Sequence, residues 1–351
     1  MNLVAPSNCY LGYGHVGWNI LYHLHKAIDV TFFPIGNVQV TSNVNATEVL
    51  QKTHYYSKDK FDPSSPTLVI WHEHGLFEKA LGSAAKLGLS FFECNKLDKI
   101  RINNLSSMDV NIQCSDWAVN VLDEYGIKSV KIPCGYDPNI FFPSKEQKKD
   151  DDYHFFNIGK MEYRKGHDVI IKAFCKAFEK DDNVKLHMLW ENPFLNEQEK
   201  GEWRGLYKSS KLGDKVIFHH QFTTDMDLAN FIRSMDFGLF PTRAEGFGLP
   251  ILQSLACGKS IVTTDYSAQA EFATTHNSFL LPISEYERMY DGKFFTNHVP
   301  AGATWAKITD ENIDQLVHVM RSAYEYRFNS TVNLVPDFTW ENTVCKLLQI
   351  L

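Results

Sequence analysis

Residues 236–258 read DFGLFPTRAEGFGLPILQSLACG, a strand-like apolar run joined through a glycine-rich loop to a helix-like segment. The apolar run ends at Pro241, Pro250 suits the first turn of a helix, and Gly258 suits its end. Two further glycines loosen the loop at 241–248, called here the elbow loop. Apolar residues recur at helical spacing and predict a helix that packs on a sheet: Ile251, Leu252, Leu255 and Ala256.

The rest of the chain repeats this alternation of strand and helix. Apolar runs predict strands at 30–36, 67–71, 153–159, 184–190, 215–220, 236–240 and 260–265. Helical spacing marks 18–27, 167–178 and 227–235, and a glycine turn is expected at 12–17. Such an order predicts parallel sheets with helices on both faces, whose ligands sit outside the carboxyl ends of the strands.

The length and one polar segment predict two domains. A chain of 351 residues exceeds the size at which one core suffices. Residues 143–152, PSKEQKKDDD, have the polarity of a linker, so we place one domain at 1–145 and a second at 146–337. Asp150 and Asp152 form an Asp-x-Asp pair in this charge run, and we interpret them as part of the linker rather than as metal ligands.

Charge and composition indicate a soluble, globular protein of the cytosol. The net charge of −7 divides into −1 for residues 1–150 (14 basic, 15 acidic) and −6 for the rest (21 basic, 27 acidic). Neither half carries the basic surface of a nucleic-acid-binding protein. No apolar run reaches the roughly 20 residues of a membrane span, and no signal peptide is recognisable. Seven scattered cysteines fit a reducing compartment, while peripheral contact with a membrane stays open.

A second motif, the basic turn at 159–166, gathers positive charge where a strand gives way to a helix. Lys160, Arg164 and Lys165 precede the helical segment at 167–178. A leaving diphosphate accumulates negative charge, and a helix N-terminus with cationic side chains stabilises it by about 2–4 kcal/mol per well-placed donor. The turn is therefore a candidate phosphate site, and a solvated basic helix start is the alternative.

Two weaker motifs lie in the first half. Gly12, Gly14 and Gly17 match GxGxxG, but a nicotinamide site also needs an acid about 20 residues on, and the strand at 30–36 ends without one. His72 and His74 flank Glu73 just past a buried strand. We expect the two histidines to point to opposite sides of an extended chain, which leaves too few convergent ligands for a metal. An active-site role for His72 and a structural one both remain open.

Together these motifs resemble the retaining glycosyltransferases of family four, which have the GT-B fold. Their signature is a glutamate, seven residues and a second glutamate; here Glu245 holds the first position and Gln253 the second. The resemblance implies that Glu245 contacts hydroxyls of the donor sugar and that Gln253 holds the ribose. The backbone at Phe247, Gly248 and Leu249 would approach sugar and phosphate.

The resemblance also assigns the remaining candidates. Lys160, where the family has arginine, and Lys165 would clamp the diphosphate, with Arg164 as a compensating cation. Gly12 and Gly14 would let the backbone approach the donor phosphate, and His72 would lie near donor sugar and acceptor. Residues 338–351 would form a helix that packs back on the first domain.

The fold implied is α/β of the GT-B type, two Rossmann-like α/β/α domains facing a central cleft. The activity implied is retaining transfer of a sugar from a nucleotide-diphosphate sugar to an acceptor hydroxyl, with no obligatory metal or other cofactor. Three alternatives remain: transfer to a modified nucleic-acid base, which the acidic charge disfavours, a dinucleotide oxidoreductase, and a sugar-nucleotide binding protein without catalysis.

Overall fold

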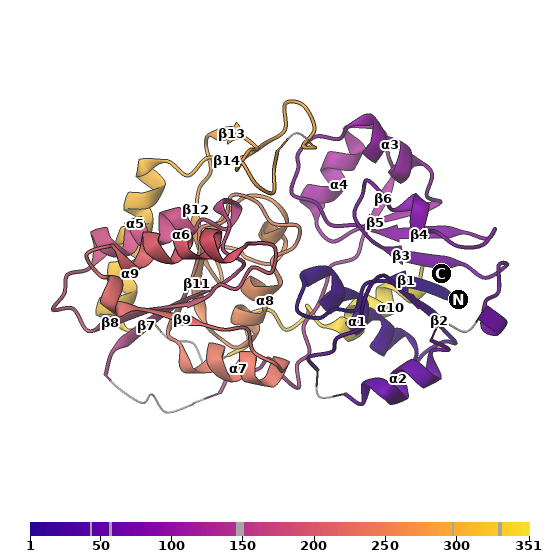
Figure 1. Cartoon of the computed structure of the whole chain (residues 1–351), viewed down its shortest axis with the longest axis horizontal. Coiled ribbons are helices and arrows are strands. Elements are labelled where there is room, and N and C mark those ends of the chain that lie inside the picture. Colours follow the sequence, from indigo (N-terminus) through magenta and orange to yellow (C-terminus); the bar gives the residue numbers. More distant parts are fainter. Residues whose placement is uncertain (43, 56–57, 145–150, 297, 329–331) are drawn as a thin grey trace. The chain divides into compact units, whose positions relative to one another are not determined.

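Two parallel β-sheets organise the computed structural model, which describes residues 1–42, 44–55, 58–144, 151–296, 298–328 and 332–351 (Figure 1). One compact unit contains Met1–Asp137, Pro300–Gly302 and Asp337–Leu351, and the other contains Pro138–Val299 and Ala303–Pro336. The division thus falls shortly before the polar segment 143–152. Residues 145–150 of that segment, including Asp150 of the acidic pair, lie outside the described residues.

The first unit holds a sheet of order β2-β1-β3-β4-β5-β6, in which every neighbouring pair is parallel. Its strands are β1 (Asn2–Ala5), β2 (Thr31–Pro34), β3 (Thr67–Ile70), β4 (Lys86–Leu89), β5 (Val110–Gln113) and β6 (Ser129–Lys131). Its helices are α1 (Gly12–Leu24), α2 (Ala46–Lys52), α3 (Lys99–Ser106), α4 (Asp116–Asp123) and α10 (Trp340–Leu348), with short 3₁₀ turns η1 (Lys58–Lys60) and η2 (Phe77–Lys79). The C-terminal α10 packs beside α1 (Figure 1).

The prediction of a glycine turn at 12–17 is wrong, because helix α1 already begins at Gly12. Two of the three glycines, Gly14 and Gly17, are needed for packing instead. A Cβ on Gly14 would lie 2.0 Å from the carbonyl oxygen of Asn8, and one on Gly17 would lie 2.0 Å from that of Pro6. Since real side chains never come so close, only glycine lets α1 pack against the segment that follows β1.

The second unit holds a sheet of order β12-β11-β10-β7-β8-β9, also parallel throughout. Its strands are β7 (Tyr153–Ile158), β8 (Val184–Leu189), β9 (Val216–His219), β10 (Phe237–Phe240), β11 (Ser260–Thr264) and β12 (Phe279–Leu281). Its helices are α5 (His167–Ala177), α6 (Glu197–Lys208), α7 (Asp225–Ser234), α8 (Leu249–Ala256) and α9 (Asp310–Tyr326), with 3₁₀ turns η3 (Tyr163–Lys165), η4 (Gly213–Lys215) and η5 (Ala268–Glu271). The strands and helices predicted in this half are confirmed.

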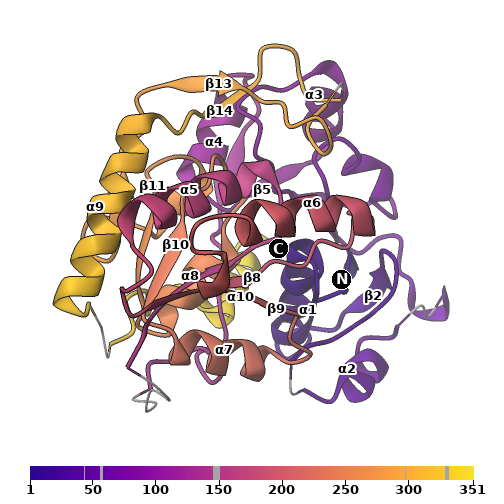
Figure 2. The ribbon, with the colours of Figure 1, turned by 60° about the vertical axis from the view of Figure 1, so that its left-hand side comes forward.

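A separate antiparallel pair, β13 (Tyr286–Arg288) and β14 (Thr304–Ala306), completes the second unit. Figures 1 and 2 draw this ribbon apart from the six-stranded sheet. Within the described part of the chain, every helix is too short or too polar to cross a lipid bilayer.

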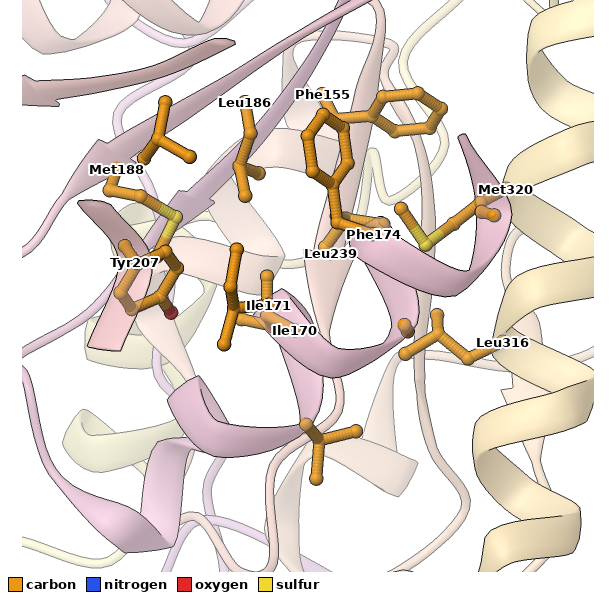
Figure 3. Packing of buried hydrophobic residues seen from close by; sticks show 14 of the residues in the cluster. Phe155, Ile170, Ile171, Phe174, Leu186, Met188, Tyr207, Leu239, Leu316 and Met320 are labelled. Carbon is orange, nitrogen blue, oxygen red and sulfur yellow. The ribbon is translucent and has the colours of Figure 1, made fainter. Parts of the chain in front are cut away.

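The core of the second unit fixes the start of α5, and with it the basic turn. Figure 3 shows Phe155 of β7, Leu186 of β8 and Leu239 of β10 facing Ile170 and Phe174 of α5. All five side chains are fully buried, and burial of such a side chain contributes about 1.5–3 kcal/mol. The outer side of α5 contacts α9 through residues such as Leu316 and Met320. Packing on both sides therefore holds the N-terminus of α5 at the carboxyl end of the sheet.

Candidate active site

The basic turn and the elbow loop meet because they follow neighbouring strands. The basic turn leaves β7, the elbow loop leaves β10, and these two strands pair in the sheet. The amide of Arg243 donates to the carbonyl oxygen of Arg164 at 2.7 Å, and the hydroxyl of Thr242 lies 3.1 Å from the same oxygen. Gly166, with φ of 74°, supports this approach, since a Cβ there would lie 2.1 Å from the carbonyl oxygen of Pro241.

Gly166→Ala is expected to lower the free energy of unfolding by about 3 kcal/mol, because it adds left-handed strain and a backbone collision. Gly292→Ala is the matched control, since Gly292 has φ of 77° but its Cβ would meet only the Tyr290 hydroxyl, at 3.9 Å. The control is expected to cost about 1 kcal/mol. Denaturant titration of both variants measures the free energy of unfolding. An equal decrease in the two variants would show that the basic turn and the elbow loop are not in close contact at Gly166.

Four charged side chains close the junction: Glu162, Arg164, Lys165 and Glu245, called here the charged quartet. The ammonium of Lys165 donates to both carboxylate oxygens of Glu245, at 2.6 and 2.8 Å. The guanidinium of Arg164 donates to Glu245 at 3.2 Å and to Glu162 at 2.6 Å. Because all four side chains are at most 14% exposed, removing one partner would leave a buried charge uncompensated, at a cost of about 3–5 kcal/mol.

Both carboxylates of the quartet are ionised. Burial raises the pKa of Glu245, but the neighbouring charges of Lys165 and Arg164 outweigh it and hold the pKa below its ordinary value. The pKa of Glu162 is lowered in the same way, chiefly by Arg164 against the effect of burial. Burial lowers the pKa of the Lys165 ammonium, and the charge of Glu245 opposes this effect. The quartet thus pairs two carboxylates with two basic side chains.

The backbone of Glu245 is held from behind by Ser267. The amide of Glu245 donates to the Ser267 hydroxyl at 2.8 Å, and that hydroxyl lies 2.8 Å from the Gln269 side-chain oxygen. Ser267 has φ of 67° and ψ of −156°, a region that residues other than glycine rarely occupy and that costs about 1–3 kcal/mol. The strained backbone of Ser267 thus places its hydroxyl where it accepts the Glu245 amide and holds the elbow loop.

The predicted backbone positions lie at the start of α8. Phe247 is buried against Phe272, with ring centroids 5.1 Å apart. Gly248, with φ of 94°, caps α8, and Leu249 is its first residue. This geometry directs main-chain amides outward from the helix N-terminus, which favours a phosphate or another polar group.

Gln253 is nearly buried, at 4% exposure, and its side-chain amide makes no hydrogen bond to the described residues. Neither polar atom of this amide is fully shielded from solvent. The amide is therefore available to a ligand or to water.

Lys160 stands on the same turn and apart from the quartet's hydrogen bonds. Its ammonium lies 5.1 Å from the centre of the Phe194 ring, and its carbonyl oxygen lies 3.1 Å from Nε2 of His167. The other ring nitrogen of His167 lies 3.0 Å from the Tyr207 hydroxyl. The His167 ring thereby fastens the basic turn to α6.

His167 is expected to make the stability of the second unit depend on pH. Burial lowers the pKa of His167 from 6.5 to about 4. Between these values the unfolded chain binds a proton that the folded chain does not, so stability is present above pH 6.5 and is lost as the pH falls. The loss is about 1.4 kcal/mol per pH unit. Denaturant titrations at pH 7, 6 and 5 of wild type and His167→Gln check this, and parallel slopes for the two proteins would contradict it.

The first unit holds Gly12, Gly14 and His72. Gly12 opens α1, and a Cβ placed on it would have no atom within 4 Å, whereas Gly14 is pressed against Asn8. His72 packs against Tyr13, with ring centroids 4.5 Å apart. The expectation that the two histidines diverge is wrong: the rings of His72 and His74 stack at 5.3 Å with 19° between their planes. The chain turns directly after β3, so the alternation of a strand no longer applies.

Between the histidines, Glu73 is buried and binds Nε of Arg101 at 2.7 Å. Burial opposes its charge, but His74 and Arg101 lower the pKa of Glu73. Among the described residues, no three or more His, Cys, Asp or Glu side chains are grouped so that they could hold a metal ion.

Sequence reasoning missed three residues of the site. Glu162 stands in the basic turn, and a lone carboxylate among three cations is a signal that could have found it. Arg243 and Ser267 act through the backbone and through partners distant in sequence, and no spacing reveals them.

Residues 139–290 match the family model described as glycosyl transferases group 1. That segment contains the basic turn and the elbow loop. Mannosylfructose-phosphate synthase of Agrobacterium fabrum is 28% identical over 213 residues, which are 52% of this chain and 47% of that protein. Alpha-monoglucosyldiacylglycerol synthase of Streptococcus pneumoniae is 22% identical over 57% of this chain and 44% of that protein. The chain thus spans about half the length of these curated relatives.

Several solved structures resemble the whole chain in fold. Anabaena HepE, crystallised with UDP and glucose, has a TM-score of 0.70 at 13% identity and covers 99% of this chain and 98% of its own. Sucrose-phosphate synthase of Thermosynechococcus elongatus has a TM-score of 0.69 at 14% identity, with 99% and 97% covered. At such identities the likeness shows the fold, and the predicted GT-B architecture of two Rossmann-like α/β units is confirmed.

Proposed function

We propose, since residues 139–290 match the model of glycosyl transferases group 1, that the chain moves a sugar from a nucleotide-diphosphate sugar to an acceptor hydroxyl, with retention of configuration. One observation carries the proposal: Lys165 and Glu245, from motifs 80 residues apart, meet at 2.6 Å at the start of α5 and α8. A cation and a carboxylate at two helix N-termini are what a sugar diphosphate needs, because its phosphates are anionic and its sugar hydroxyls are hydrogen-bond donors.

In this proposal the donor exchanges partners with the quartet. Lys165 turns from Glu245 to the diphosphate, Lys160 adds a second positive charge, and amides at Phe247, Gly248 and Leu249 face the phosphates. Glu245 remains ionised beside Arg164 and accepts hydrogen bonds from the sugar hydroxyls. Gln253 would take the ribose hydroxyls. The crystal structure of HepE with UDP and glucose supports a donor of this class.

Retention follows in the proposal from a reaction on one face of the sugar. As the bond from the anomeric carbon to the phosphate oxygen breaks, Lys165 stabilises the charge that develops on the diphosphate. The acceptor hydroxyl attacks from the same side and gives its proton to the departing phosphate oxygen. His72 of the first unit would lie near donor sugar and acceptor, with Gly12 and Gly14 near the phosphate. Lysines and helix termini do the work of a metal ion, so none would be obligatory.

The proposed function is tested by nucleoside diphosphate release from UDP-, GDP- and ADP-sugars, with candidate acceptors present. For the sugars of one of the three nucleotides, we expect nucleoside diphosphate release well above the rate in buffer without protein. NMR of the product is expected to show the anomeric configuration of the donor. Binding without release would instead indicate a sugar-nucleotide binding protein. Transfer confined to modified DNA would indicate the nucleic-acid alternative, and hydride transfer to a nicotinamide would indicate an oxidoreductase.

Gln253→Glu is expected to tighten donor binding about fivefold, since a charged hydrogen bond exceeds a neutral one by roughly 1 kcal/mol. The substitution adds an acceptor without changing the length of the side chain. Calorimetric titration with the nucleoside diphosphate measures the effect. Unchanged or weaker binding would remove Gln253 from the ribose site.

A further inference from the structure

One buried cation outside the quartet, Arg243 of the elbow loop, contacts the basic turn, α5 and the ribbon β13–β14. Its side chain is 3% exposed, and its two terminal nitrogens donate to the two oxygens of Asp168, each at 2.9 Å. Its Nε donates to Glu287 of β13 at 2.9 Å. Asp168 lies in the first turn of α5, so a single planar guanidinium joins the helix behind the basic turn to the ribbon β13–β14.

The backbone and the aromatic contacts of Arg243 extend this link. The guanidinium lies 3.4 Å from the centre of the Tyr163 ring and donates to the Tyr163 carbonyl oxygen at 2.7 Å. The carbonyl oxygen of Arg243 accepts the amide of Ala306 on β14 at 3.1 Å. The carboxylate of Glu287 also accepts Nε1 of the buried Trp305, at 3.1 Å. Both strands of the ribbon are thus attached to the residue that lies two positions before Glu245.

The ribbon also reaches the quartet. Phe295, from the segment between β13 and β14, packs edge-on against Trp305 with ring centroids 5.3 Å apart. The guanidinium carbon of Arg164 lies 6.0 Å from the centre of the Phe295 ring. The segment between β13 and β14 therefore lies beside the side chain that donates to Glu245.

We infer that Arg243 is a positioning residue for sugar transfer and that Glu287 is its partner on the ribbon. Together they hold the ribbon β13–β14 as a wall of the donor site and set the placement of Lys165 and Glu245. This inference rests on the proposed function. It explains why a ribbon with a sheet of its own, outside the main sheet, is fastened by a buried arginine with two carboxylate partners.

Two conservative substitutions weaken the ion pair between Arg243 and Glu287 while they keep a side chain of similar size at each position. Arg243→Lys keeps the charge but loses the planar fork, and Glu287→Gln keeps the shape but loses the charge. Glu285→Gln is the matched control beside the same ribbon, because the exposed Glu285 carboxylate accepts the exposed ammonium of Lys307, at 2.6 Å. Each protein is assayed for kcat, donor KM and midpoint of thermal unfolding.

Because a misplacement of about 1 Å can cost a hundredfold in rate, we expect Arg243→Lys and Glu287→Gln to lower kcat at least tenfold per folded molecule. Donor KM is expected to change less than threefold, and Glu285→Gln is expected to match wild type. Wild-type kcat in both variants, or a loss that the fraction of unfolded protein accounts for, would overturn the inference alone. A wild-type chain without transfer would overturn the proposed function, and the inference with it.

Discussion

Glu245→Gln is expected to lower the kcat of sugar transfer at least a hundredfold, while its affinity for the nucleoside diphosphate stays equal or rises. In the proposed mechanism the Glu245 carboxylate accepts hydrogen bonds from the sugar hydroxyls. The sugar becomes positively charged in the transition state, and a neutral amide stabilises that charge poorly. Lys165 loses its charged partner in the variant, so its ammonium is freer to bind phosphate. A loss of rate without a loss of affinity for the nucleoside diphosphate is specific to the exchange of partners proposed here.

The amide variant is a cleaner test than alanine. Glu245→Ala would empty a buried position beside two cations, at a cost of about 3–5 kcal/mol, and the variant could fail by unfolding. Glu179→Gln provides the control, since Glu179 is an exposed carboxylate of the same unit, paired with Lys211 at 2.7 Å. If Glu245→Gln retains more than a tenth of the wild-type kcat, Glu245 does not contact the reacting sugar.

Lys165→Met is the second substitution with a large expected effect, a fall in kcat/KM of at least a hundredfold. Methionine retains the length of the side chain and most of its packing but removes the charge that neutralises the leaving diphosphate. The Kd of the nucleoside diphosphate is expected to rise at least tenfold. Glu245 keeps Arg164 as a partner in this variant, so the loss of stability is expected at the lower end of about 3–5 kcal/mol.

Lys211→Met is the control for the lysine substitution, because Lys211 is an exposed lysine of the same unit. Stopped assays at several donor concentrations separate kcat from KM, and circular dichroism reports the fold. An unaltered Kd for the nucleoside diphosphate in Lys165→Met would place the phosphates elsewhere.

The sequence predicts the sheet of the second unit well, because buried parallel strands appear as continuous apolar runs such as 153–159 and 236–240. It also predicts the elbow loop, since Pro250 and Gly258 mark the helix start and end. It fails at Gly12–Gly17, where glycines of low helix propensity stand inside α1. Tertiary packing overrides helix propensity there, because α1 can pack against the segment after β1 only where side chains are absent.

The partners within the site could not be read from the sequence for a different reason. Arg243 meets Glu287 44 positions away, and Arg164 meets Glu245 81 positions away, so the pairings exist only after the sheet has formed. The positive φ of Ser267 is a backbone state that its residue type disfavours. His72 and His74 were assigned the alternation of a strand that had already ended at Ile70.

The central claim is that the basic turn and the elbow loop together bind a nucleotide-diphosphate sugar. The most direct test is unfolding of wild type and Lys165→Met in the presence of UDP, GDP, ADP and their sugars. One of these nucleoside diphosphates, alone and as its sugar, is expected to stabilise wild type by about 2.7 kcal/mol at a concentration of 100 Kd. Lys165→Met is expected to lose most of this stabilisation at the same concentration. Equal stabilisation of the two proteins, or none by any nucleotide, would contradict the claim.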